Sequence, residues 1–313
     1  MKTDLRINIG KLKLKNPVMV ASGTFGYAEE FEGFMDLSRL GAIVTKTITL
    51  KPRKGNPAPR TCETPSGLLN SIGLENPGVD AFIKDKLKYL LSTGAPVIVS
   101  IASEKDASEF VELASLLDKV KEISAIELNI SCPNIKKESR NQGAEGLSLI
   151  SQDARATYEL VKAVRRKTRK VIITKLSPNV TCISDIARAA ESAGSDAISL
   201  INTLSGMCIN INTRRPKIAS VTGGLSGPAI RPIAVRMAWE VFNNIKLPII
   251  GMGGIMNTSD ALEFIVAGAT AVSIGTANFV YPDTAIKIIS GLEEYLSKNK
   301  IKTVRSIIGG LEV

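Results

Sequence analysis

The chain has 313 residues, a formal net charge of +10 and no histidine. The absence of histidine excludes every mechanism that depends on a histidine base or a histidine metal ligand. No stretch reaches the roughly 18 uninterrupted apolar residues of a membrane-spanning helix, and the first residues include Asp4 but lack the apolar run of a signal peptide. We therefore expect a cytoplasmic protein with no membrane partner.

The charge and the cysteines exclude further classes. Basic residues cluster at 11–15, 165–170 and 298–305, but no aromatic residues interleave with them, so solvated helix faces are favoured over nucleic-acid binding. The four cysteines are far apart and form no CxxC pair: Cys62, Cys132, Cys182 and Cys208. This spacing predicts no metal site, no iron–sulfur cluster and no disulfide framework in this chain.

Eight short runs rich in Val and Ile, each bounded by Gly, Pro, Asn or Ser, predict β-strands at 17–23, 42–49, 96–102, 125–131, 171–178, 197–203, 248–254 and 271–277. Helical patterns lie between several of these runs, at 107–121, 151–166, 184–193, 230–243 and 259–267. Alternating strands and helices are typical of a parallel sheet, and eight such units favour closure. The expected fold is α/β, a single (β/α)₈ TIM barrel domain spanning residues 1–313.

Long intervals follow the second, fourth and sixth strands. These segments, 50–77, 132–146 and 204–228, are rich in Pro, Gly, Asn and Arg and leave the carboxyl ends of their strands. Because functional sites of barrels lie at that end, we expect the three loops to converge over the mouth and cover a site. The alternative is that these loops have no role in a site or form a contact between subunits of an oligomer.

Two lysines stand inside otherwise apolar strands, Lys46 in VTKT and Lys175 in ITKL. A buried ammonium group is costly unless it faces a polar ligand or a counter-charge. The favoured interpretation is that both face a ligand at the barrel mouth. The alternative is an ion pair with a core carboxylate, for which Glu127 on the fourth strand is the nearby candidate.

Other polar or glycine residues also end the predicted strands. The set is Ser22, Thr47, Ser100, Asn129, Asn202, Thr203, Gly253, Gly254, Gly275 and Thr276. Glycine-rich turns after the last two strands, together with GGLSG at 223–227, favour a phosphate cradle made of backbone amides.

The asparagines Asn70, Asn129, Asn134 and Asn202 offer both donors and acceptors, which suits a planar ring with alternating N–H and C=O groups. Cys132, in ELNISCPN just past the fourth strand, is a candidate nucleophile or proton acceptor. The alternative for Cys132 is a small buried hydrophobic residue. Singly each asparagine could be a turn residue, but together at one mouth the asparagines predict a pyrimidine-like or similar ligand.

The same segments resemble the class 1 dihydroorotate dehydrogenases, and within them the type B catalytic subunit. The matching motifs run through nearly the whole chain in order: ASGTFGY, TKTIT, ETPSGLLNSIGLENPG, ELNISCPN, KLSPNVT, INTLSGM, TRRPKIASVTGGLSGPAIRP, PIIGMGGI and VSIGTANF. GTFGY and KPRKGNPAPR are the segments that favour type B over type A. The resemblance implies oxidation of dihydroorotate to orotate in pyrimidine biosynthesis, with FMN as the flavin cofactor.

The resemblance also implies roles for single residues. Cys132 corresponds to the base that takes a proton from C5 while hydride leaves C6 for the flavin. Substrate contacts correspond to Lys46, Asn70, Ser71, Ile72, Gly73, Leu74, Asn129, Asn202 and Thr203. FMN contacts correspond to Ser22, Lys46, Thr47, Ser100, Asn129, Lys175, Ile201, Gly227, Gly253, Gly254, Gly275 and Thr276.

Three positions depart from the family pattern. Ser100 stands where asparagine is usual, which predicts a shorter or water-mediated flavin contact. Residues 135–146 are longer and more charged than the usual glycine-rich loop. Cys182 replaces aspartate, and nothing in the sequence explains it.

The resemblance implies partners as well. Type B enzymes are homodimers of this subunit that join a second, iron–sulfur flavoprotein subunit in a heterotetramer. That subunit carries FAD and a 2Fe–2S cluster and passes electrons to NAD⁺. The competing interpretations are another FMN-barrel oxidoreductase acting on a pyrimidine, a type A enzyme using fumarate, and a non-catalytic nucleotide-phosphate binder.

Overall fold

A computed structural model describes residues 3–131 and 150–312. Eight parallel strands form a closed barrel in the order β10-β15-β16-β3-β4-β7-β8-β9. In chain order they are β3 (Val18–Val20), β4 (Ala42–Val44), β7 (Val97–Ile101), β8 (Ala125–Asn129), β9 (Val171–Lys175), β10 (Ala197–Leu200), β15 (Ile249–Gly251) and β16 (Ala271–Ile274). The predicted TIM barrel and its eight strands are confirmed, although each strand is shorter than its apolar run.

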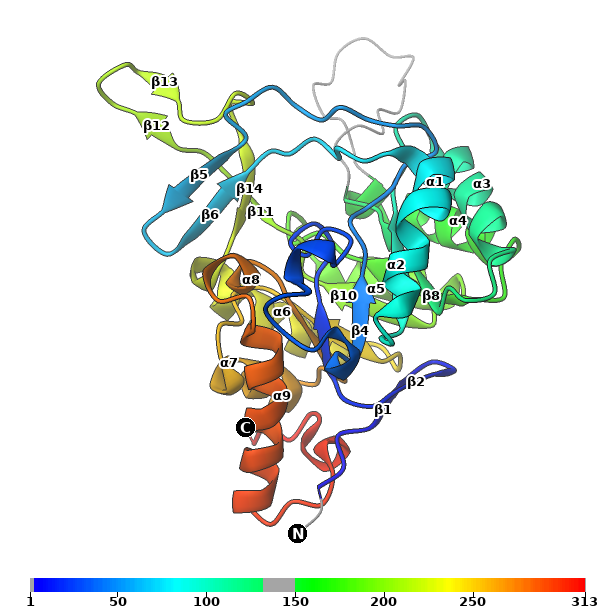
Figure 1. The fold of residues 1–313 in the computed structure, drawn as a ribbon, viewed down its shortest axis with the longest axis vertical. Helices are drawn as coiled ribbons and strands as arrows, with labels where there is room; N and C mark the ends of the chain where they lie inside the picture. Colours follow the sequence, from blue (N-terminus) through cyan, green and yellow to red (C-terminus); the bar gives the residue numbers. More distant parts are fainter. Residues whose placement is uncertain (1–2, 132–149, 313) are drawn as a thin grey trace.

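Helices cover the outside of this barrel (Figure 1). They are α1 (Gly78–Ala81), α2 (Leu87–Ser92), α3 (Ala107–Asp118), α4 (Ala154–Arg165), α5 (Ile183–Ser192), α6 (Arg231–Phe242), α7 (Thr258–Val266), α8 (Ala277–Val280) and α9 (Thr284–Lys298). A π-helical turn, Phe82–Lys86, joins α1 to α2, and short 3₁₀ turns lie at Glu29–Phe31, Leu37–Arg39, Ile150–Gln152, Pro228–Ile230 and Val304–Ile307. One hydrophobic core joins the outer faces of the strands to the inner faces of the helices.

The loops after the second and sixth barrel strands pair with each other. The first contributes β5 (Thr61–Thr64) and β6 (Gly67–Asn70), and the second contributes β11 (Leu204–Gly206) and β14 (Gly223–Ser226). They form an antiparallel sheet in the order β11-β14-β6-β5, which we call the mouth sheet. The expectation that these two loops converge is confirmed, while the third expected loop, 132–146, lies outside the described residues.

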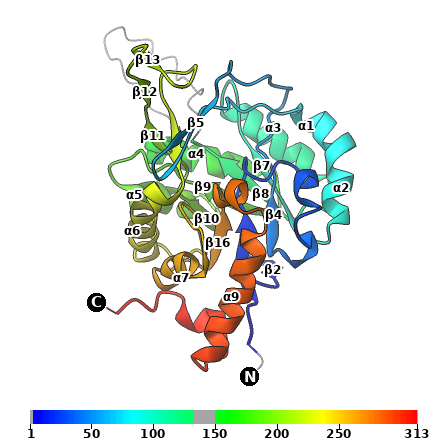
Figure 2. The ribbon, with the colours of Figure 1, turned by 60° about the vertical axis from the view of Figure 1, so that its left-hand side comes forward.

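Figures 1 and 2 show the mouth sheet beyond one end of the barrel, with the hairpin of β12 (Ile209–Asn210) and β13 (Arg215–Pro216) projecting from it. The N-terminal hairpin of β1 (Ile7–Ile9) and β2 (Leu12–Leu14) lies toward the opposite end, as do both chain termini. The N-terminal hairpin and the termini therefore leave the end of the barrel under the mouth sheet free for a site.

Candidate active site

A cavity of about 540 Å³ lies between the carboxyl ends of the barrel strands and the mouth sheet. Its volume is within the range of sites for small molecules and cofactors. Most of the polar lining comes from residues that directly follow barrel strands, because parallel strands end at the same rim. The mouth sheet adds the opposing wall, including Leu68, Gly224 and Ser226.

A hydrogen-bond chain crosses the floor of this cavity. Asn202 Nδ2 donates to Asn129 Oδ1 over 3.2 Å, and Asn129 Nδ2 donates to Thr47 Oγ1 over 3.2 Å. Thr47 Oγ1 in turn lies 3.0 Å from Ser22 Oγ and 2.9 Å from Ser100 Oγ. This chain of hydrogen bonds joins residues at or just beyond the carboxyl ends of five different strands. It therefore fixes their side chains relative to one another.

The cavity is electrostatically positive. Lys46 and Lys175 both line it, and no carboxylate belongs to the lining described here. Lys175 is buried, with Nζ 3.9 Å from Oε1 of the equally buried Glu127. Both interpretations of Lys175 are therefore correct: it faces the cavity, and it also has a buried counter-charge in Glu127. Lys46 is half-buried and has no ion pair with the part of the chain that is described.

Six carboxamide side chains from the described part of the chain line the cavity, compared with two lysines. Asn56, Asn70, Asn129, Gln152, Asn179 and Asn202 all contribute to its surface. Asn70 Nδ2 donates to Gly224 O over 3.2 Å, which ties the second loop to the sixth. Asn56 Nδ2 donates to Ser71 Oγ over 2.8 Å. At Gly73, φ is +76° and a Cβ would collide with the Asn56 side chain, so a side chain is excluded there.

One wall of the cavity is built from glycine turns. Gly227, Gly253 and Gly254 have φ of +93°, +129° and +73°, a region that favours glycine. A Cβ on Gly254 would lie 2.8 Å from Gly227 O, so the two turns pack against each other. Beside them, Thr276 Oγ1 donates to Ser226 Oγ over 2.8 Å. The arrangement brings backbone and hydroxyl groups from β14, β15 and β16 together, as a phosphate cradle requires.

Most of the predicted site residues meet in this one cavity. All of the predicted substrate and cofactor contacts line it except Ser100. Ser100 is fully buried, and its Oγ lies 2.9 Å from Thr47 Oγ1. Ser100 is absent from the lining and bonds to the lining residue Thr47, and its expected shorter or water-mediated flavin contact stays a prediction. Cys132, the predicted base, lies outside the described residues, although its neighbour Ser131 lines the cavity.

Sequence reasoning missed several lining residues, notably Asn56, Gln152 and Asn179. Asn179 follows the fifth barrel strand by four residues and bonds to Ser177 and to Thr203 O. Gln152 Nε2 donates to Asn179 O over 2.8 Å. The only available sequence signal was the KLSPN motif, because Asn56 and Gln152 reach the cavity through tertiary contacts.

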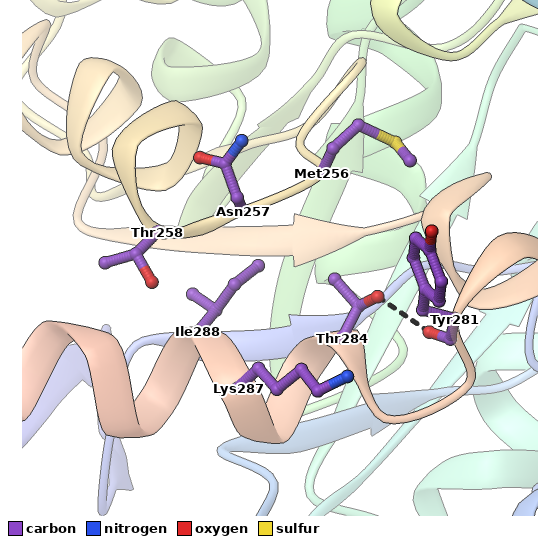
Figure 3. A pocket seen from close by; sticks show the side chains of 7 residues that line it. All are labelled: Met256, Asn257, Thr258, Tyr281, Thr284, Lys287 and Ile288. Carbon is purple, nitrogen blue, oxygen red and sulfur yellow. Dashed lines mark hydrogen bonds between the residues drawn. The ribbon is translucent and has the colours of Figure 1, made fainter.

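A second cavity, of about 120 Å³, lies between the start of α7 and α9 (Figure 3). Its lining includes Asn257, Thr258, Tyr281 and Lys287, and Lys287 forms a 2.9 Å ion pair with Asp283. This volume is below the usual range for ligand sites. The cavity under the mouth sheet is therefore the candidate active site.

The described residues contain no cluster of three or more His, Cys, Asp or Glu side chains placed to hold a metal ion. Within the same ranges, no helix has the length and apolar character needed to span a membrane.

Comparisons with known proteins agree with this geometry. The family model for dihydroorotate dehydrogenase matches residues 4–296. Over the full length of both chains, the sequence is 52% identical to a dihydroorotate dehydrogenase B (NAD(+)) catalytic subunit of Trichlorobacter lovleyi. Proteins with the same name from Geotalea uraniireducens and Bacteroides thetaiotaomicron are 51% and 49% identical, each over 99% of both chains. The chain belongs to the dihydroorotate dehydrogenase family.

Proposed function

We propose that this chain is the catalytic subunit of an NAD-linked dihydroorotate dehydrogenase, which oxidises dihydroorotate to orotate in pyrimidine biosynthesis. The observation that carries the proposal is the lining of the mouth cavity: two lysines and six carboxamides, with no carboxylate among the described lining residues. Such a lining suits an anionic ring with alternating N–H and C=O groups. The full-length similarity to catalytic subunits of this name supports the same reaction.

The cavity wall fits FMN. Among the described residues, a Cβ on Gly275 would lie within 4 Å of Ala21 Cβ alone, at 3.9 Å, so this part of the wall leaves room for a bound group. We propose that the turns at Gly227, Gly253–Gly254 and Gly275–Thr276 hold the phosphate through backbone amides. Ser22, Lys46, Thr47, Asn129, Lys175 and Ile201 would hold the rest of the flavin, with Ser100 acting through Thr47. FMN, when bound, supplies the acceptor for the hydride that leaves C6 of the substrate.

The remaining lining residues would orient the substrate. Lys46 offers a cation to the carboxylate of dihydroorotate, and the amides of Asn129 and Asn202 pair with its ring. Residues 70–74 and Thr203 close the opposite side. Holding the ring in one orientation lowers the entropic part of the barrier, because C5 and C6 then face their respective acceptors.

Cys132 is the proposed general base, taking the proton from C5 onto its sulfur. A thiol is chemically able to do this as the thiolate, and a chain without histidine lacks the usual alternative. An apolar surrounding would raise the pKa of such a thiol, whereas nearby ammonium groups would lower it.

Electrons then leave through a partner. The name of the relatives supports NAD⁺ as the final acceptor and a second subunit beside the catalytic one. We propose that this subunit carries FAD and a 2Fe–2S cluster and that two copies of each subunit form a heterotetramer around a homodimer of the present chain. In this proposal the chain is one FMN-binding barrel domain over residues 1–313.

An anaerobic titration tests the function. Protein purified with FMN should lose its flavin absorbance with dihydroorotate and keep it with dihydrouracil. Reoxidation by NAD⁺ should require the partner subunit, and fumarate should be slow. Rapid turnover with fumarate alone would indicate a type A enzyme. Protein that takes up no FMN would instead indicate a non-catalytic binder.

A further inference from the structure

Glu127 lies inside the barrel, directly below the cavity floor. It is 1% exposed and stands on β8 two residues before Asn129, so both side chains are on the same face of the strand. On the next strand, Lys175 pairs in register with Asn129 on one side and with Ser199 on the other. Glu127, Lys175 and Ser199 thus form one interior cluster under the proposed flavin site.

The contacts of this carboxylate are incomplete. Ser199 Oγ donates to Glu127 Oε2 over 3.1 Å. Glu127 Oε1 has no hydrogen-bond partner within the described ranges, and it lies 3.9 Å from Lys175 Nζ. That distance is too long for a hydrogen bond but short enough for a strong interaction between charges in a poorly hydrated interior.

If the Glu127–Lys175 pair contributed only to packing, it would be energetically unfavourable. Burying two charges costs more than their attraction returns unless hydrogen bonds satisfy the remaining lone pairs, and apolar residues of similar volume often replace such pairs without loss. Here one carboxylate oxygen is left unsatisfied, while the ammonium group is held at the cavity surface. The arrangement stabilises the position and charge of Lys175 rather than the fold.

We propose that Glu127 is a positioning residue that aims the Lys175 ammonium group at the cavity and offsets part of its charge, which sets the reduction potential of the flavin bound there. The inference rests on the proposed function, because it places FMN next to Lys175. Positive charge near a flavin favours its reduced, anionic form. A counter-charge 3.9 Å behind the ammonium group weakens that effect.

The test compares Glu127→Gln with Glu127→Asp in the FMN-loaded protein. The glutamine variant keeps the shape but removes the negative charge, so the FMN potential should rise by the equivalent of at least a tenfold change in the reduction equilibrium, about 30 mV for two electrons. The aspartate variant keeps the charge and should stay close to the wild-type potential. A glutamine variant that binds FMN with an unchanged or lower potential would overturn the proposal, as would an equal shift in both variants.

Ser199→Ala provides a second route if the glutamine variant does not fold. Without the Ser199 hydroxyl, the negative charge of the Glu127 carboxylate is less screened, so the FMN potential should fall. This fall should be smaller than the rise expected for Glu127→Gln. The matched control is Ser273→Ala, which removes another buried serine hydroxyl, on β16, without a hydrogen-bond partner among the described residues. An unchanged potential in Ser199→Ala, or an equal change in the control, would count against the proposal.

The potential is measured with reductant and indicator dyes, without dihydroorotate. If the wild-type protein binds FMN but dihydroorotate fails to reduce it, the proposed substrate is wrong while the role of Glu127 can still be measured. If dihydroorotate reduces the wild-type flavin and the Glu127→Gln potential does not move, only the present inference fails.

Discussion

Asn202 Nδ2 donates a 3.2 Å hydrogen bond to Asn129 Oδ1, which leaves Asn129 Nδ2 to donate to Thr47 Oγ1. The Asn129 side chain is therefore held from both ends, and its amide orientation is fixed before any ligand enters. Two residues 73 positions apart are joined in this way at the floor of one cavity. A fixed amide can discriminate between ring edges that a freely rotating one would accept equally.

Asn129→Ala should weaken orotate binding and slow flavin reduction by dihydroorotate. The substitution leaves Asn202 Nδ2 without the acceptor that Asn129 provides, and Thr47 Oγ1 keeps only its contacts with Ser22 and Ser100 among the described residues. The lost hydrogen bond costs about 1–3 kcal/mol, or roughly 5- to 150-fold in the dissociation constant or the rate. Stopped-flow experiments measure the rate of flavin reduction, and titration with orotate measures its dissociation constant. Asn299→Ala is the control, since the side-chain amide of Asn299 donates to Tyr295 O at the surface, away from the cavity lining. Equal values for Asn129→Ala and the wild type would remove Asn129 from the site.

Gly275→Ala should weaken FMN binding without destabilising the protein that lacks FMN. Within the part of the chain that the structure describes, the added methyl meets only Ala21 Cβ within 4 Å, so it occupies space on the cavity side rather than in the core. We expect at least a tenfold rise in the FMN dissociation constant, measured by fluorescence of released flavin, with no loss of thermal stability in the FMN-free form. Gly33→Ala is the matched control, because a Cβ there meets nothing within 4 Å and Gly33 does not line the cavity. Unaltered FMN affinity in Gly275→Ala would argue against the proposed cradle.

Cys132→Ser and Cys132→Ala should keep FMN bound while slowing its reduction by dihydroorotate by several orders of magnitude. Only the deprotonated thiol accepts the proton, so the wild-type rate should rise with pH and level off above the thiol pKa, about 8.5 for an unperturbed cysteine. Reduction rates between pH 6 and 10 measure this dependence. Cys182→Ala controls for the loss of a thiol elsewhere. Wild-type rates in both Cys132 variants would exclude this residue as the base.

Asp4 should contribute to stability at neutral pH and stop doing so in acid. Hydrogen bonds from Arg6 to its carboxylate lower the pKa of Asp4 from 3.8 to about 2. Because the folded-state pKa is depressed, the contribution is present above about pH 4 and disappears as the pH falls toward 2. Asp4→Asn should lower the free energy of unfolding at pH 7 by less than about 1 kcal/mol, as is usual for surface pairs. Urea unfolding of both proteins at pH 7 and pH 2.5 measures the gap, and a gap that widens in acid would contradict the assignment.

The sequence predicted those features that depend on the composition of a single strand and on the end of the barrel at which the strand ends. The eight Val- and Ile-rich runs identified the barrel strands, because a β-branched strand buried on both faces has a recognisable composition. Residues such as Asn129, Lys175 and Thr276 could then be assigned to one rim, since all parallel strands of a barrel end there. The glycines at 253, 254 and 275 were identified for the same reason.

Other parts of the site depend on contacts between distant segments. The pairing of β6 with β14 brings Asn70 beside Gly224, 154 residues further along the chain, and no local pattern in either loop predicts that partner. Asn56 and Gln152 reach the cavity only through such packing. Ser100 also depends on a distant contact, because its strand-end position gives no sign that its hydroxyl bonds to Thr47, 53 residues away, or that it is absent from the cavity lining.

The sequence by itself determined the barrel, the end of it that carries the chemistry, and most of the polar groups there, because each depends on the period of one strand and the direction in which it runs. Only the tertiary structure decided which groups touch. It joined Asn202 to Asn129, bonded the Ser100 hydroxyl to Thr47, and showed that Lys175 faces both the cavity and Glu127. The physical reason is that hydrogen bonds and charge interactions depend on a few ångströms between atoms on different strands, and strand composition does not specify such distances.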